Sequence, residues 1–183
     1  AALAQIVTVA VRMLDNIIDI SRYPLDQQRR EAVAKRRIGL GVTGLADALI
    51  MCRARYGAAD AVALTERWMA ALRRHAYRAS IDLAAEKGAF PLFDAAPYLA
   101  SGSLSTLDAE LRDRIARDGV RNALITSIAP TGTISLLADN VSSGIEPVYG
   151  FTHERSVLTP DGGRREDTLS DFTYRAYQRQ FGA

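Results

Sequence analysis

The stretch that most constrains the fold is Asn122–Ser135, where a short apolar run meets a sharp corner. Asn122-Ala-Leu-Ile-Thr-Ser-Ile128 is largely apolar and bounded by turn residues, as is typical of a buried strand in a parallel sheet. Pro130-Thr-Gly-Thr133 breaks this run, and Ile134 to Asn140 can restart as a helix. A strand that turns directly into a helix indicates an α/β fold.

Helical periodicity dominates the rest of the chain. Apolar residues recur at spacings of three and four from Leu3 onward, which predicts a helix that ends near Arg22, because Tyr23-Pro24 disfavours further helix. A polar, mostly basic connector is expected from there through Arg37. More helix than strand, with no clear linker and no internal repeat, predicts one helix-rich α/β domain over residues 1–183.

The elements expected downstream follow from capping residues and turn signals. Three helices are expected: Thr43–Tyr56 with Gly57 as its cap, Asp60–Lys87 with Asp60 as N-cap, and Thr106 to Asp118 with Gly119 beyond its end. A hairpin or a tight surface turn is expected around Val157–Arg165, and an amphipathic stretch over Phe172–Phe181. The arginines of the second of these helices are expected on its solvated side.

Composition excludes several classes of protein. The 23 Lys and Arg residues against 21 Asp and Glu residues leave a net charge of +2, which is too weak to indicate a surface for polymeric nucleic acid. No apolar run approaches a membrane helix and no signal segment opens the chain, so we expect a soluble cytoplasmic protein with no membrane partner. One cysteine and two histidines provide neither a disulfide framework nor a metal site.

The corner at Pro130 is the strongest candidate site. A helix start presents free N–H groups and the positive end of the helix dipole, Gly132 permits an unusual backbone angle, and nearby hydroxyls add donors. The predicted phosphate-binding residues are Pro130, Thr131, Gly132, Thr133, Ile134 and Ser135. No P-loop lysine follows, so this corner is expected to bind phosphate rather than transfer it. The alternative is a simple turn with an N-capping threonine.

Other conspicuous residues favour structural roles. Gly39-Leu-Gly41-Val-Thr-Gly44 fits a dinucleotide-binding pattern, but no buried strand precedes it and no suitably spaced acid follows, so we interpret it as a close approach of backbone before a packed helix. Glu146 lies in an apolar context and is expected to be paired, with possible support of the active site as the alternative. The remaining candidates are expected to be structural: Asp15 and Asp19 bonded to backbone or arginines, His75 and His153 at surface or interface positions, and Cys52 packed inside.

Four strings in order resemble the large chain of ribonucleotide reductases. They are Leu14-Asp-Asn-Ile-Ile-Asp19 with Tyr23-Pro24, Arg37-Ile-Gly-Leu-Gly-Val-Thr-Gly-Leu45, Ala129-Pro-Thr-Gly-Thr-Ile-Ser135, and Asn140-Val-Ser-Ser-Gly-Ile-Glu-Pro147. The third string looks more like the adenosylcobalamin-dependent class than the diferric-tyrosyl class. The resemblance implies the C-terminal part of a ten-stranded α/β barrel, in which the stretch matching Pro130–Ile134 binds the substrate's phosphates.

The resemblance also implies a chemistry that this chain does not contain. In the family, a thiyl radical reduces the 2′-hydroxyl of a ribonucleoside diphosphate or triphosphate, and a thioredoxin-like protein supplies electrons through further cysteines. Cys52 matches none of those cysteine motifs, so no catalytic residue is assigned here and adenosylcobalamin is expected to bind mostly elsewhere. We lean to the diphosphate by family resemblance.

The ends of the chain suggest that it is a piece of a larger barrel. The first residues already run in helical phase with no cap before them, so we expect either an excised part, incomplete at both ends, or a subunit of a split enzyme. Three hypotheses follow: a reductase segment that binds substrate phosphate, a non-catalytic or regulatory subunit of a split reductase, and an NAD(P)-binding oxidoreductase.

Overall fold

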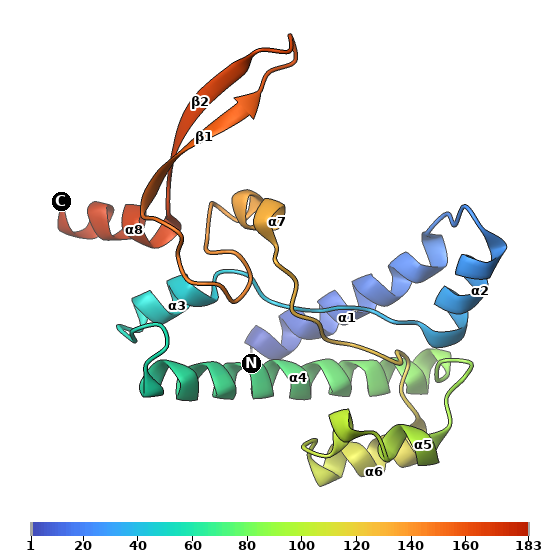
Figure 1. The fold of residues 1–183 in the computed structure, drawn as a ribbon. Coiled ribbons are helices and arrows are strands. Elements are labelled where there is room, and N and C mark those ends of the chain that lie inside the picture. The colour runs from blue at the N-terminus through green and yellow to red at the C-terminus, as the bar shows by residue number, and fades with distance from the viewer. Residues whose placement is uncertain (1, 183) are drawn as a thin grey trace. The chain divides into compact units, whose positions relative to one another are not determined.

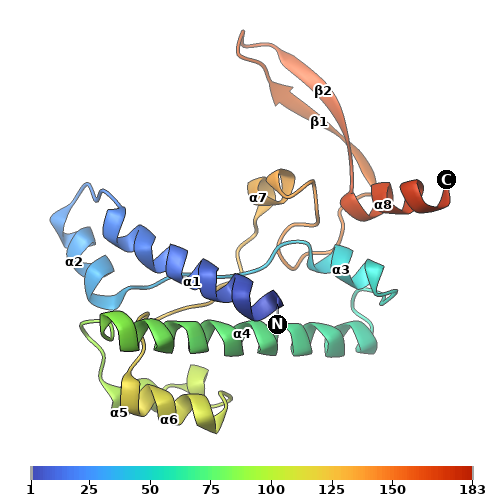
Figure 2. The same ribbon diagram turned by 180° about the vertical axis from the view of Figure 1, so that it is seen from behind.

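The computed structural model describes residues 2–182, which form two compact units. The first unit comprises the described residues up to Leu40 together with Arg67–Ser127. The second comprises Gly41–Glu66 and the described residues from Ile128 onward. Figure 1 and Figure 2 show the elements from opposite sides.

Helices make up the first unit. They are α1 (Ala2–Ile20), α2 (Asp26–Lys35), α4 (Ala59–Lys87) from Arg67 onward, α5 (Ala95–Leu99), a 3-10 turn (Gly102–Leu104) and α6 (Ala109–Asp118). In both views α4 runs between α1 on one side and α5 with α6 on the other (Figures 1 and 2). Ion pairs agree with this order, since Arg12 of α1 binds Glu86, and Arg114 of α6 binds Asp82. The core contains Val7, Val11, Ala76, Ile81, Leu111 and Ile115.

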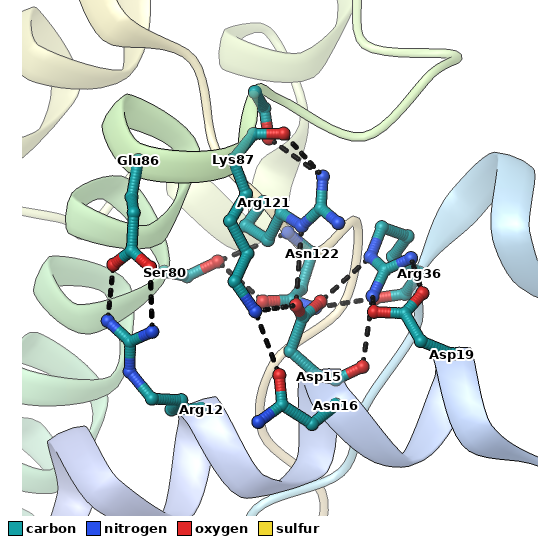
Figure 3. Close-up of polar contacts among 11 residues, drawn as sticks. Arg12, Asp15, Asn16, Asp19, Arg36, Ser80, Glu86, Lys87, Arg121 and Asn122 are labelled. Carbon is teal, nitrogen blue, oxygen red and sulfur yellow. Dashed lines mark hydrogen bonds and ion pairs between the residues drawn. The ribbon is translucent and has the colours of Figure 1, made fainter.

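A buried polar cluster joins the elements of this unit (Figure 3). Asp15 on α1 is fully buried, and its carboxylate accepts hydrogen bonds from Arg36 Nε at 2.8 Å and Asn122 Nδ2 at 2.9 Å. Arg36 also donates to Asp19, and Asn122 bonds to Ser80 of α4. Asp15 and Asp19 therefore bond to arginines, as predicted, and serve the fold.

The expected strand at Asn122–Ile128 forms only a short parallel pairing in the described residues. Leu40 and Thr126 make one isolated parallel bridge, supported by the bonds Ile38 N–H to Leu124 O at 2.9 Å and Ser127 N–H to Leu40 O at 3.0 Å. Leu124 and Ile128 stay exposed. The α/β character and the excess of helix are confirmed, while a closed barrel is not seen in residues 2–182.

Several expected boundaries were wrong, because capping patterns alone do not decide where a helix begins. The basic connector contains α2, which has good helix formers but no apolar stripe to reveal it. α3 (Leu45–Met51) is shorter than Thr43–Tyr56, so Gly57 does not cap it. α4 begins at Ala59, which places Asp60 inside its first turn, and Asp108 rather than Thr106 precedes α6.

The arginine-rich side of α4 is less solvated than expected. Arg73 donates to Thr106 Oγ1 and to the Ser103 carbonyl, both at 2.7 Å, and Arg74 pairs with Asp108 and Glu110. These arginines therefore connect α4 to the segment that leads into α6.

The second unit contains α3, α7 (Gly132–Leu137), the hairpin β1 (Thr152–Leu158) and β2 (Arg164–Ser170), and α8 (Phe172–Phe181). The two strands pair antiparallel from Thr152 opposite Ser170 to Leu158 opposite Arg164, which confirms the predicted hairpin. Asp171 caps α8 by accepting from the Thr173 amide, so the predicted amphipathic helix is confirmed as well. Within this unit the hairpin extends away from α7 and α8 (Figures 1 and 2). No helix between residues 2 and 182 is both long and apolar enough to cross a membrane.

Candidate functional site

Four segments of the second unit meet around the predicted phosphate corner. They are the corner itself with α7, the turn from Thr43 to Asp47 that opens α3, the loop from Ser142 to Glu146, and the start of α8 at Asp171–Thr173. Segments about 90 to 130 residues apart in sequence are thus joined by hydrogen bonds.

Thr131 is the residue that shapes the corner. Its backbone is left-handed, with φ 53° and ψ 25°, an uncommon conformation for a β-branched residue. Its hydroxyl accepts the Gly144 N–H at 2.6 Å and donates to Thr43 Oγ1 at 2.9 Å, and Thr43 in turn donates to the Ser142 carbonyl at 3.0 Å. These bonds hold Thr131 in a conformation that it would otherwise avoid.

Gly144 brings the second loop against the corner. Its φ is +51°, and a Cβ at this position would lie 2.6 Å from the Ala129 carbonyl oxygen. Only glycine fits such an approach without movement of the backbone. Gly132, in contrast, has no positive φ and open space where a Cβ would be, so the prediction that Gly132 carries the unusual angle was wrong. The angle falls on Thr131, whose side chain is bonded on both sides.

The first turn of α7 leaves donors free. Ser135 N–H is the first amide of this turn to find an acceptor, the Thr131 carbonyl at 2.8 Å. Among the described residues, the amides of Gly132, Thr133 and Ile134 have no acceptor, and all three residues are exposed. Thr131 makes no side-chain cap bond, so the alternative of a turn capped by threonine does not describe this corner.

The three hydroxyls of the corner have different roles. Thr131 bonds to Thr43, and the buried Ser135 donates to the Gly132 carbonyl at 2.9 Å. Thr133 is exposed and its side chain makes no hydrogen bond within the described part of the chain. Only Thr133 therefore offers a hydroxyl that is not already used in holding the loop.

Two buried acids, Asp47 in the first turn of α3 and Asp171 at the N-cap of α8, support the corner. Asp47 accepts the Ser142 N–H at 2.6 Å and bonds to the Thr173 hydroxyl, which also lies 2.8 Å from Asp171. Burial raises the pKa of Asp47, but the hydrogen bonds from Ser142 and Thr173 outweigh it and leave the pKa below its usual value. Burial and the neighbouring Asp47 charge raise the pKa of Asp171. Asp47 therefore carries the charge, and Asp171 holds a proton more readily.

A family model for the ribonucleotide reductase barrel domain matches residues 1–172. The chain belongs to the ribonucleotide reductase family.

Relatives of this chain come from several kinds of organism. A vitamin B12-dependent ribonucleoside-diphosphate reductase of Mycobacterium tuberculosis is 41% identical over 157 residues, which cover 85% of this chain and 20% of the relative. One from Thermoplasma acidophilum is 35% identical, covering 85% of this chain and 18% of the relative. A large subunit from Caenorhabditis elegans is 33% identical, covering 87% and 21%. The chain thus spans about a fifth of the length of these relatives.

The amides that follow the Gly39–Gly44 pattern, at the start of α3, are bonded to the loop that contains Ser142 and Gly144. Gly44 N–H donates to the Ser142 carbonyl at 2.7 Å, Leu45 N–H to the Gly144 carbonyl, and Ala46 N–H to Ser142 Oγ. The amides at the start of α3 are therefore already bonded within the chain, whereas a dinucleotide-binding turn leaves the amides at its helix start free for the pyrophosphate. A Cβ on Gly39 would lie 2.6 Å from Ser127 Oγ, which confirms the interpretation as a close approach of backbone.

A pocket of about 380 Å³ opens beside α7. It is lined by Gly132 and Ser135 of the corner, by Asn140, Ser143, Glu146 and Tyr149, and by His153 and Arg155 of β1. Glu146 is exposed and its carboxylate makes no hydrogen bond in residues 2–182, so the expectation that it is paired was wrong. Glu146 lines the same pocket as Gly132, so a role in supporting the active site stays a prediction.

The remaining candidates lie apart from the corner. Cys52 is exposed at the end of α3, so the expectation of a packed cysteine was wrong. His75 is half-buried on α4, and His153 is half-buried on β1. In the described part of the chain no group of three or more His, Cys, Asp or Glu side chains could hold a metal ion.

Sequence reasoning missed the residues that hold the corner in place: Thr43, Asp47, Ser142, Gly144, Asp171 and Thr173. Thr43 lies inside the Gly39–Gly44 pattern, and Gly144 lies inside the fourth family string. Both were visible as members of motifs, but their contact with Thr131 depends on tertiary structure.

Proposed function

We propose that this chain is part of an adenosylcobalamin-dependent ribonucleoside-diphosphate reductase, and that Pro130–Ser135 binds the phosphates of the substrate. The observation that carries this proposal is the row of three unpaired, exposed amides of Gly132, Thr133 and Ile134. Amides at a helix start that point to solvent favour an anion, because both the N–H groups and the helix dipole attract negative charge.

The preorganised loop supports the same function. Thr131 and Gly144 fix the backbone before a ligand arrives, so little ordering remains to be done on binding. No lysine or arginine lies in the corner, and its nearest hydroxyls are neutral. Because it has no cationic side chain, such a loop can bind a phosphate without promoting its transfer. This suits an enzyme whose reaction takes place elsewhere on the nucleotide.

The whole enzyme supplies the chemistry of the reaction. The relatives named as vitamin B12-dependent reductases act on ribonucleoside diphosphates, and we extend that cofactor, that substrate class and the thiyl-radical reduction of the 2′-hydroxyl to the protein that contains this chain. When bound, adenosylcobalamin supplies the radical that starts the reaction. The pocket of about 380 Å³ suits part of a nucleotide rather than a corrinoid ring, so no residue here is assigned to the cofactor.

A stripe on α1 supports a partner for this segment. Leu3, Ile6, Val9, Met13, Ile17 and Ile20 are between 42% and 77% exposed, and their spacing of three or four residues places them on one helix face. The opposite face, with Val7, Val11 and Ile18, packs inside the first unit. We propose that the remaining four-fifths of the reductase covers the exposed stripe. That remainder also carries the catalytic cysteines and receives electrons from a thioredoxin-like protein.

The second candidate function is a non-catalytic or regulatory subunit of a split reductase. The same α1 stripe favours it, because a separate subunit needs an apolar surface to assemble. The arrangement of the gene separates the two: a continuous reading frame upstream with the cysteines favours the first function, and a start codon close to Ala1 favours the second.

The test removes single donors from the corner of the complete reductase. Thr133→Pro deletes one amide in the first turn of α7 that has no acceptor there, so no helix hydrogen bond is lost, and Thr133→Ala deletes only the hydroxyl. A hydrogen bond to a charged group contributes about 1.5 to 3 kcal/mol, so Thr133→Pro should weaken binding of cytidine diphosphate about tenfold or more. Thr133→Ala should have a smaller effect, and cytidine itself should bind all three proteins alike. Unchanged diphosphate binding by Thr133→Pro would exclude the phosphate assignment.

A further inference from the structure

A positively charged side chain, Arg155, lines the pocket beside α7 and lies outside the four strings that resemble the family. Arg155 is the only lysine or arginine among the residues that line it, together with Gly132 and Ser135 of the corner. Arg155 lies on β1, two positions from His153. Alternate residues of a strand point to one side, which agrees with the presence of both side chains in the lining.

Arg155 has no ion-pair partner between residues 2 and 182. The acid opposite it in the hairpin is Asp167, and that carboxylate is bonded to Arg165 at 2.7 Å and 2.8 Å through both of its oxygens. Both oxygens of Asp167 are therefore bonded to an arginine of its own strand rather than to Arg155. Arg155 is exposed and keeps its guanidinium available.

The pocket needs this charge if an anion is to bind there. The donors of the corner are neutral: the amide of Gly132, which lines the pocket, and the amides of Thr133 and Ile134 with the Thr133 hydroxyl, which belong to the same turn but are not in the pocket lining. Glu146 and Asp171 also line the pocket, and the exposed Glu146 carboxylate would repel a phosphate. A guanidinium presents several N–H donors in a plane that matches phosphate oxygens, so Arg155 is suited to offset both the ligand's charge and that of Glu146.

We propose that Arg155 is the cationic partner of the phosphate group held by the α7 amides, so that this pocket selects nucleotides by the charge of their phosphates. The inference rests on the proposed phosphate function of the corner and adds a residue outside it. The hairpin is then part of the substrate site, with β1 forming one wall of the pocket and α7 the other.

The experiment compares two arginines of the same hairpin in the complete reductase. Arg155→Gln removes the proposed partner, and Arg164→Gln removes an exposed arginine on β2 that does not line the pocket. Binding of cytidine diphosphate, cytidine monophosphate and cytidine is measured by calorimetry for each protein. We expect Arg155→Gln to weaken the diphosphate about tenfold or more and to leave cytidine unchanged, Arg155→Lys to recover part of the loss, and Arg164→Gln to match the unaltered enzyme.

Each other outcome decides against the inference. Equal effects of Arg155→Gln and Arg164→Gln would show that the hairpin's positive charge attracts the ligand non-specifically and that Arg155 forms no site. An equal loss for cytidine would show a structural effect. If Thr133→Pro weakens the diphosphate and Arg155→Gln does not, the corner binds phosphate and Arg155 has no part in it. If neither changes binding, the proposed function fails together with this inference.

Discussion

Arg36 Nε lies 2.8 Å from Asp15 Oδ1, and both side chains are buried, with 3% and 0% of the side chain exposed. Arg36 has a left-handed backbone at φ 47° and directly follows α2, so its side chain returns to α1. Burial lowers the pKa of Arg36, but the bonds to Asp19 and Asp15 outweigh it and hold the pKa above its usual value. The pair therefore fixes the direction in which the chain leaves α2 toward Leu40 and its pairing with Thr126.

Substitution Asp15→Asn should destabilise the fold strongly. It keeps the size of the side chain but leaves a buried guanidinium with only the half-exposed Asp19 as a charged partner. Loss of one member of a buried ion pair costs about 3 to 5 kcal/mol. Because Arg36 keeps its contact with Asp19, we expect the free energy of unfolding to fall by about 3 kcal/mol. Urea unfolding followed by circular dichroism measures it. The control Asp113→Asn, at an exposed acid with no ion pair in residues 2–182, should change stability by less than about 0.5 kcal/mol.

The helices with a clear apolar stripe could be predicted from the sequence, whereas α2 could not. α1, α4 and α6 each bury an apolar face, so their periodicity locates them to within a few residues, and α8 has the same periodicity although Thr173 is its one buried residue. α2 buries no residue and has no periodic signal to detect. The apolar composition of Asn122–Ile128 predicts a buried strand, but in residues 2–182 its pairing is limited to the bridge between Thr126 and Leu40, and Leu124 and Ile128 are exposed.

Substitution Gly144→Ala should destabilise the protein by more than the cost of a positive φ alone. A Cβ there would lie 2.6 Å from the Ala129 carbonyl oxygen, so the two loops would have to separate. Gly57→Ala is the matched control, because Gly57 also has a positive φ, +81°, but nothing lies within 4 Å of its Cβ position. Left-handed backbone costs about 1 to 2 kcal/mol in both variants, and crowding should add about 1 to 3 kcal/mol in Gly144→Ala alone. Equal stabilities in denaturant unfolding would show that the close approach does not matter.

The candidate site was predictable at the level of the loop but not of its supports. Pro130–Ser135 stands out because proline, glycine and hydroxyl residues follow an apolar run. The positive φ of Thr131 could not be predicted, because it depends on the bonds to Thr43 and Gly144, which come from distant parts of the chain. Glu146 looked buried from its apolar neighbours in sequence, but a loop between glycine and proline turns it outward.

The buried acids Asp47 and Asp171 should give the stability of the protein a defined pH dependence. An aspartic acid in the unfolded chain loses its proton at about pH 4. Because the pKa of Asp171 is raised in the folded state, the folded protein keeps this proton to a higher pH. Its contribution to stability is therefore complete below about pH 4 and is lost as pH rises through the folded pKa. Asp47 has the opposite sign, since its lowered pKa gives stability above about pH 4 that is lost as pH falls.

Substitution Asp171→Asn tests this assignment. The asparagine oxygen can still accept from the Thr173 amide and cap α8, and its NH₂ group can donate to Asp47. We expect the unfolding free energy of the variant, relative to the unaltered protein, to increase as pH is raised from about 4 to 7. Asp113→Asn should run parallel to the unaltered protein over the same range. Parallel curves for Asp171→Asn would mean that Asp171 holds no proton in the folded state.

The exposed stripe of α1 should be needed for assembly rather than for folding. Ile6→Lys with Met13→Lys places two charges on that face, where both side chains are more than half exposed. Surface substitutions of this kind change stability by about 0.5 kcal/mol or less each, so helical content should be retained. Burying the two ammonium groups against the rest of the reductase would be strongly unfavourable, so the variant should fail to cosediment with that remainder. Gln5→Lys with Thr8→Lys adds the same charge to exposed positions between the two faces and should assemble normally. If both double variants assemble alike, the stripe is not the contact surface, and the remainder of the reductase must bind this chain elsewhere.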